Sequence, residues 1–195
     1  TNYYHVIYNA NIALTNGASM SISQTTGVGG TSWWCGSTEN LCALTMAGNS
    51  TLTLDGSNGL SGVVADVDNS EISVSNPKSG KAFVNLADGS SITGSSITSV
   101  STENNGLELY IGGGVDITDS EVDMGSSSIV VIGGATLDAT GSTIDVTQFK
   151  YRGAGDAALV GGTVTGEFAN DSGASPMFAV DGTTIAGKSK ISTPI

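Results

Sequence analysis

The sequence predicts an all-β fold, a single-domain parallel β-helix of about seven to eight rungs. One unit is written twice: Val115 to Met124 recurs as Leu137 to Val146, about 22 residues later. In both copies apolar and polar residues alternate on either side of a small polar corner, as in strands with one buried face. A repeat of this length that keeps its apolar positions in register indicates a solenoid.

The unit can be followed along the chain as two ladders of mostly apolar residues. The residue after each corner gives the first ladder: Met20, Leu52, Ile72, Ile97, Val122, Ile144, Val164 and Ile185. The residue five positions earlier gives the second: Thr15, Ala47, Val67, Ile92, Ile117, Ala139, Leu159 and Val180. Between them lie Gly, Asn, Asp, Ser and Thr, which accept turn geometry.

A third apolar run opens several units, so that each turn of the helix contains three short strands. It occurs at Leu41 to Leu44, Ala82 to Leu86, Leu107 to Ile111 and Ile129 to Ile132. A two-layer β-sandwich is the main alternative, because it also has short strands between regular turns. Repetition in register across many units favours the solenoid.

The domain prediction covers residues 1–195 as one β-helix. Residues 1–14 are expected to form an N-terminal capping strand, because a solenoid end exposes unpaired backbone and its terminal units are atypical. Residues 24–40 interrupt the repeat as a loop insertion, and residues 41–195 form the rungs. The end of the chain is a last strand or a truncation within a longer solenoid.

The insertion contains the first candidate site residues. Cys35 and Cys42 are the only cysteines, and a short separation favours one disulfide between them, which indicates an oxidising compartment. Trp33 and Trp34 precede Cys35. They are candidate ligand contacts, with a cap over the open end of the helix as the alternative.

A second distinctive stretch, Gln148 to Arg152, combines the only arginine with a lysine and two aromatic residues in an acidic protein. Tyr151 and Arg152 are therefore candidate contacts for a carbohydrate or an anion. A packed rung edge with solvated charges is the alternative.

Two pairs of aspartates are expected to stack on neighbouring rungs, Asp116 over Asp138 and Asp123 over Asp145. Like charges at strand spacing repel unless a cation lies between them, so these four residues are candidate calcium ligands. The alternative is a screened acidic face; no other cofactor is expected. Asn49 and Asn170 each begin an Asn-x-Ser/Thr sequence, the pattern of an N-glycosylation acceptor.

The formal net charge of −12 argues against nucleic acid and against anionic membranes as partners. No apolar run is long enough to span a bilayer, so membrane insertion is not expected. Catalysis has little support: Asp116 and Asp138 are the best carboxylate pair, and the only histidine is His5. A polysaccharide lyase or glycoside hydrolase on a β-helix is kept as an alternative.

The units Gly48 to Leu54 and Gly134 to Val146 resemble the passenger domains of bacterial autotransporters, notably the self-associating adhesins. The close spacing of Cys35 and Cys42 is similar to that of these passengers. The resemblance implies a right-handed β-helix that is secreted or displayed on the cell surface for adhesion or aggregation. The expected partners are further copies of the chain or host and surface glycans and proteins; a filament-forming surface subunit is a second alternative.

Overall fold

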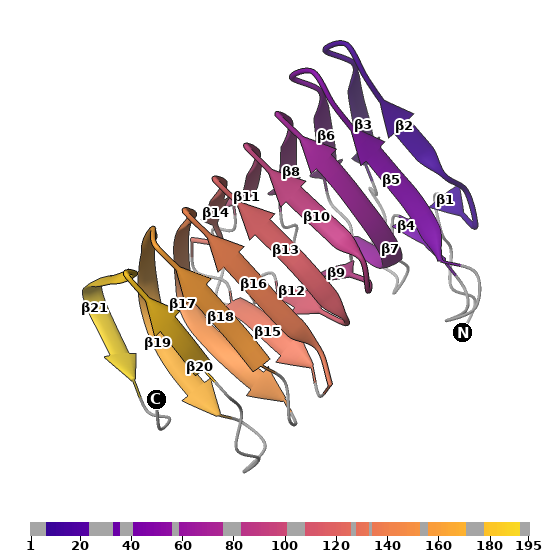
Figure 1. Ribbon diagram of the computed structural model, residues 1–195. Helices are drawn as coiled ribbons and strands as arrows, with labels where there is room; N and C mark the ends of the chain where they lie inside the picture. The colour runs from indigo at the N-terminus through magenta and orange to yellow at the C-terminus, as the bar shows by residue number, and fades with distance from the viewer. Residues whose placement is uncertain are drawn as a thin grey trace.

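The computed structural model describes residues 7–23, 33–35, 41–55, 59–75, 83–100, 108–125, 128–132, 134–152, 156–170 and 178–191. These residues form 21 strands that wind into a rod (Figure 1). The strand pairings among these residues are all parallel, and each joins one turn of the chain to the next. The predicted fold class, an all-β parallel solenoid, is confirmed.

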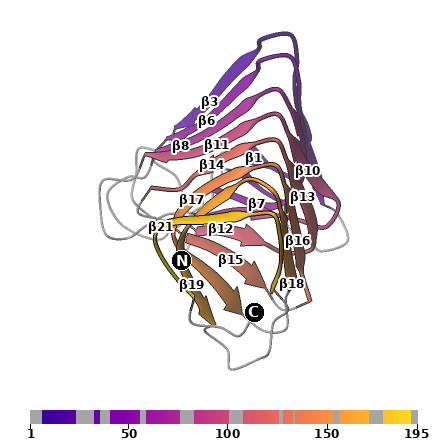
Figure 2. The same ribbon diagram turned by 60° about the vertical axis from the view of Figure 1, so that its left-hand side comes forward.

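The rod has three sides, called here sheets A, B and C, which the chain visits in the repeating order C, B, A (Figure 2). Sheet A follows the polar corner and consists of β3 (Ser19–Ser23), β6 (Thr51–Asp55), β8 (Glu71–Ser75), β11 (Ser96–Val100), β14 (Glu121–Asp123) and the first parts of β17 (Thr143–Arg152), β19 (Thr163–Asn170) and β21 (Thr184–Ile191).

Sheet B precedes the corner. It consists of β2 (Ile12–Leu14), β5 (Cys42–Met46), the second part of β7 (Gly59–Asp68), β10 (Ser90–Thr93), β13 (Gly114–Thr118), β16 (Thr136–Thr140), β18 (Asp156–Val160) and β20 (Phe178–Asp181).

Sheet C closes the triangle. It consists of β1 (Ile7–Tyr8), β4 (Trp33–Trp34), the first part of β7, β9 (Phe83–Leu86), β12 (Glu108–Ile111), β15 (Ser128–Ile132) and the later parts of β17, β19 and β21.

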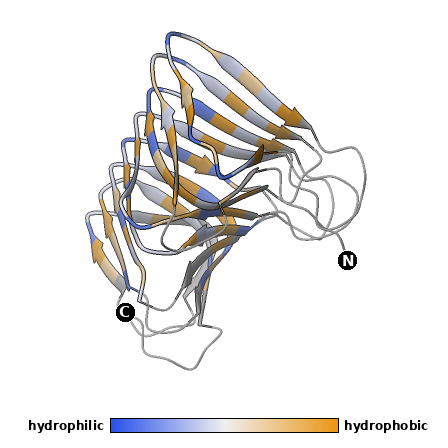
Figure 3. Ribbon diagram, turned by 90° about the vertical axis from the view of Figure 1, so that its right-hand side faces the viewer, coloured by the Kyte–Doolittle hydropathy of each residue, from blue (hydrophilic) through white to orange (hydrophobic). Residues whose placement is uncertain are grey.

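One apolar column fills the rod, because alternate residues are buried in most of the strands whose side chains the structure describes. Hydrophobic and hydrophilic residues accordingly alternate along many of the strands (Figure 3). The first ladder is confirmed residue by residue: Met20 pairs with Leu52, and the register continues through Ile72, Ile97, Val122, Ile144 and Val164 to Ile185. Sheet C adds Phe149 and Phe168, whose rings stack inside with centroids 5.5 Å apart.

The second ladder is confirmed from Val67 onward and is wrong by one residue before it. The buried residues are Leu14 and Met46, whereas Thr15 is exposed and Ala47 half-buried. The corner from Met46 to Leu52 is one residue longer than later corners. The residue five positions before Leu52 is therefore Ala47, which lies outside the core, and the buried residue is Met46, one position earlier. The prediction that Leu41 to Leu44 belongs to the third run is also wrong, because β5 lies in sheet B, paired with the second part of β7.

The N-terminal stretch contains two short strands on different sides of the rod. Asn9, with φ of 48°, separates them. β1 pairs with β4 in sheet C, and β2 pairs with β5 as the first strand of sheet B. Residues 1–6 of the expected capping strand, most of the 24–40 insertion, and residues 192–195 lie outside the described residues.

Candidate functional site

The corner between sheets B and A carries a polar groove of about 570 Å³ that runs along several rungs. Its lining residues come from equivalent corner positions of successive turns: Asn49, Ser50, Thr51, Asn69, Ser70, Glu71, Gly94, Ser95, Ser96, Asp119, Ser120, Glu121, Gly141 and Thr143. Its lining contains three carboxylates, those of Glu71, Asp119 and Glu121, and no basic residue.

The bend that shapes the groove depends on left-handed backbone at each corner, at one residue in most turns and at two, Gly48 and Asn49, in the first turn that lines it. Asn49, Asn69 and Asp119 adopt φ values of 63°, 44° and 48°, and glycine takes the same place at Gly94 and Gly141. Asn, Asp and Gly are the residues that tolerate this conformation best. The backbone amide of each donates to a carbonyl of the next turn, as from Asn69 to Thr93 O at 3.0 Å.

The floor of the groove is a ladder of buried serines: Ser50, Ser70, Ser95, Ser120 and Ser142. The amide of each of the first four donates to the hydroxyl oxygen of the next serine, at 3.0 to 3.2 Å. Each hydroxyl also lies within bonding distance of a carbonyl in its own corner, such as Ser120 Oγ to Thr118 O at 2.7 Å. The hydroxyls of Ser70, Ser95, Ser120 and Ser142 therefore each accept one bond and donate one, and the Ser50 hydroxyl donates one, so the floor is structural.

The serine ladder ends at Gly162. This residue occupies the next equivalent position with φ of 71°, and a Cβ there would overlap the carbonyl oxygen of Ser142. Sequence reasoning recognised these serines only as turn-formers. The signal that could have revealed the ladder is the recurrence of Ser at the same place between the two apolar ladders in five consecutive units.

The aspartate pairs lie on adjacent rungs as expected. Asp116 pairs with Asp138 on the outer side of sheet B, and Asp123 pairs with Asp145 on sheet A. All four side chains are exposed. Neither pair belongs to the groove lining. Among the residues that the structure describes, no three His, Cys, Asp or Glu side chains come together in a metal-binding arrangement.

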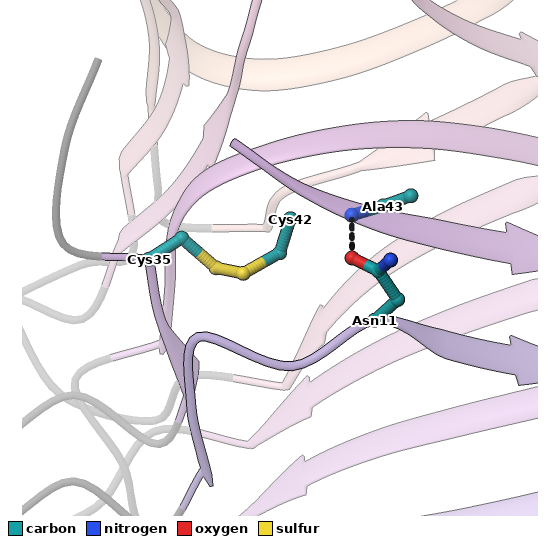
Figure 4. The surroundings of a disulfide bond; sticks show 4 residues. All are labelled: Asn11, Cys35, Cys42 and Ala43. Carbon is teal, nitrogen blue, oxygen red and sulfur yellow. Dashed lines mark hydrogen bonds between the residues drawn. A yellow bond between two sulfur atoms is a disulfide. The ribbon is translucent and has the colours of Figure 1, made fainter. Parts of the chain in front are cut away.

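The disulfide between Cys35 and Cys42 is present and buried, which confirms the predicted pairing (Figure 4). It ties the residue after β4 to the first residue of β5, with 5.8 Å between the two Cα atoms. Next to it, the amide of Ala43 donates to the side-chain oxygen of Asn11 at 2.9 Å. Gly62 lies next to Cys35 and adopts a φ of 71°. A Cβ at this position would lie 3.0 Å from the Cys35 carbonyl oxygen.

The four candidate ligand contacts are divided between distant turns of sheet C. Trp33 and Trp34 form β4, with backbones opposite Ile7 and Tyr8 on one side and Leu60 and Ser61 on the other. Tyr151 and Arg152 end β17, opposite Val131 and Ile132. Their side chains lie outside the described part of the structure.

The two sequon asparagines differ in position. Asn49 is exposed at the corner, where its backbone is left-handed. Asn170 is the last residue of β19, opposite Tyr151, and its side chain is not among those described. Ser50, the middle residue of the first sequon, is fully buried in the serine ladder.

Sheet C holds a buried polar cluster that sequence reasoning missed. Glu108 is only 5% exposed although its neighbour Leu109 fills the core. Its carboxylate accepts a hydrogen bond from the Tyr110 hydroxyl and lies 3.8 Å from Lys150 Nζ, two rungs further along. Beside them, Gln148 Nε2 donates to Glu167 Oε2 at 3.3 Å. Period-two alternation predicts that the Glu108 side chain points away from the apolar column, but it does not predict that neighbouring side chains bury it.

Comparison with known proteins adds no assignment: no family model, curated protein or solved structure matches this chain. Nothing in the described ranges forms a helix whose length and apolar character would let it cross a bilayer.

Proposed function

We propose that the chain is an extracellular or cell-surface adhesive β-solenoid that associates with further copies of itself. The observation that carries the proposal is the long outer surface of sheets A and B, on which Ser, Thr, Asp and Glu side chains recur at every rung. Each polar contact between two rods contributes about 1 kcal/mol or less. Because the contacts repeat with the rungs, many weak bonds act together.

The disulfide supports an oxidising, extracellular setting, because such bonds persist mainly outside the cytosol. The resemblance to autotransporter adhesins supports display on, or release from, a cell surface. Surface glycans and proteins are the alternative partners, with Trp33, Trp34, Tyr151 and Arg152 as their proposed contacts.

Sedimentation velocity over a wide concentration range, with and without salt and calcium, tests self-association. We expect reversible formation of larger species and clumping of cells that display the chain. A strict monomer under every condition, with no clumping, would reject the proposal and leave ligand binding as the remaining role.

Filament formation through the ends of the rod is the second candidate. In the last described turn, Val180 and Ile185 are only half-buried, whereas their neighbours one rung earlier, Leu159 and Val164, are 1% and 2% exposed. A copy stacked on this turn would cover them. Electron microscopy separates the two modes, because end-to-end stacking gives filaments one rod wide and side-to-side contact gives clumps or sheets.

A further inference from the structure

The first corner of the rod, between β2 and β3, is a tight turn built on Asn16 and Gly17. Both residues are exposed and left-handed, with φ of 57° and 75°. The amide of Ala18 donates to the carbonyl oxygen of Thr15 at 3.2 Å and closes the turn. Two consecutive left-handed residues in a two-residue turn are typical of type I′, for which Asn-Gly is the preferred sequence.

Asn-Gly is also the sequence in which asparagine loses its side-chain amide most readily. The backbone nitrogen of the second residue gives up its proton and bonds to the side-chain carbonyl carbon, and the side-chain nitrogen leaves with a proton as ammonia. Water then opens the resulting cyclic imide at either carbonyl, which gives aspartate or isoaspartate. Glycine has no side chain to hinder the attack. The sequence contains two more Asn-Gly pairs, but Asn58 and Asn105 lie outside the described residues.

The closed turn does not hold the reacting atoms together. In a type I′ turn the nitrogen of the second residue lies anti to the Cβ of the first about the Cα–C bond, away from the side-chain carbonyl carbon. The attack therefore requires rotation about that bond and a brief local opening of the corner. How fast a corner asparagine reacts depends on the interactions that such an opening breaks.

Two later corners contain a left-handed asparagine followed by serine, Asn49-Ser50 and Asn69-Ser70. The amides of the two asparagines donate to carbonyl oxygens of the next turn, at 2.7 and 3.0 Å. The amides that would attack, those of Ser50 and Ser70, donate to hydroxyl oxygens of the serine ladder at 3.2 and 3.0 Å, and both serines are buried. Opening either corner therefore breaks hydrogen bonds to the next turn and uncovers a buried serine.

The first corner lacks both kinds of protection. Among the residues that the structure describes, the backbone amides of Asn16 and Gly17 find no hydrogen-bond acceptor. Opening this turn breaks the bond between Ala18 and Thr15, and its four residues are exposed or half-buried already. The fold therefore favours reaction at this corner over the two later ones.

We propose that Asn16 is a spontaneous deamidation site of the native rod, converted to aspartate and isoaspartate while Asn49 and Asn69 are protected by the bonds of their corners. This modification is independent of the proposed adhesive role. Either product adds a negative charge to residues 12–23, which contain none. Isoaspartate also adds one carbon atom to the main chain, so the product no longer fits a two-residue turn and the first corner loosens.

Peptide mapping by mass spectrometry tests the proposal, on protein kept at mildly alkaline pH with and without denaturant. In the unfolded chain each asparagine reacts at the rate set by its local sequence, so the ratio of unfolded to folded rate measures the protection by the fold. Loss of a buried hydrogen bond corresponds to about tenfold or more in rate. We therefore expect the protection of Asn16 to be lower than that of Asn49 and Asn69 by at least this factor. Equal protection at the three sites overturns the proposal.

Ser70→Ala is a matched variant, because it removes the acceptor of the Ser50 amide and leaves the Asn49-Ser50 pair unchanged. It is expected to speed deamidation of Asn49 in the folded protein about tenfold, while Asn16 keeps its rate. Ser96→Ala, beside the ladder, is the control and should leave both rates unchanged. An unchanged rate at Asn49 in Ser70→Ala overturns the protective role of the ladder. The wild-type comparison decides the proposal even where this variant does not fold.

Discussion

The backbone amide of Ser95 donates a hydrogen bond to the hydroxyl oxygen of Ser120, one rung further along the rod, at 3.1 Å. Both residues are buried, and the Ser120 hydroxyl is within 2.7 Å of the carbonyl oxygen of Thr118. The serine thus joins two rungs through groups that water does not reach. A left-handed corner cannot use the regular strand ladder at this point, and the side chain supplies the missing acceptor.

Replacing Ser120 by alanine should lower the free energy of unfolding by about 1 to 3 kcal/mol, because the buried amide of Ser95 would lose its acceptor. Denaturant unfolding followed by circular dichroism measures the change. Ser96→Ala is the matched control: this serine begins β11 beside the ladder with a half-buried side chain, and should change stability by less than about 0.5 kcal/mol. Equal effects from the two variants would contradict a structural role for the ladder.

The apolar column makes a second prediction. Ile144→Asp should prevent folding, because Ile144 is 1% exposed and the aspartate would place an unpaired charge inside the rod. Thr143→Asp, one residue earlier and exposed, should leave the protein folded. The yield of soluble protein and its circular dichroism spectrum report the difference. A folded Ile144→Asp protein would show that the register is misplaced.

Ser99 places an unsatisfied polar atom on the inward side of the rod. Its hydroxyl oxygen is buried without a hydrogen-bond partner, on the inward side of β11 opposite Val74. Ser99→Val should raise the free energy of unfolding by about 1 kcal/mol, because it removes the unsatisfied group and adds apolar contact. Ser73→Val, at a half-buried outward position of β8, is the control and should have little effect. A loss of stability in Ser99→Val would indicate that an internal water satisfies the hydroxyl.

How far the sequence predicts this structure depends on the range of the interaction concerned. Alternation within a strand is local, so the ladder from Met20 to Ile185 could be predicted to the residue. The corner before Leu52 has one extra residue, which local counting does not reveal, and Met46 was missed for that reason. The burial of Glu108 depends on Lys150, two turns away, and no periodic pattern within one strand specifies that contact.

The disulfide between Cys35 and Cys42 should protect both thiols from alkylation until a reductant is added. The double variant Cys35→Ala with Cys42→Ala should be less stable by about 2 to 3 kcal/mol, the value that chain entropy predicts for so short a loop. Wild-type protein unfolded in reductant is the control and should lose a similar amount. Free thiols in freshly isolated native protein would remove the argument for an oxidising compartment.

The cluster on sheet C yields a test by a double-mutant cycle. Lys150→Met removes the ammonium group 3.8 Å from the Glu108 carboxylate and keeps most of the side-chain volume. The side chains of Glu108 and Lys150 are 6% and 19% exposed, so water replaces the lost cation poorly, and stability should fall by about 1 to 3 kcal/mol. Adding Glu108→Gln removes the carboxylate charge that Lys150 no longer offsets, while retaining an acceptor for the Tyr110 hydroxyl. The double variant should therefore be more stable than Lys150→Met alone, by about 1 kcal/mol or more in denaturant unfolding. Strictly additive losses would show that Lys150 and Glu108 contribute independently and that the two do not form an ion pair in solution.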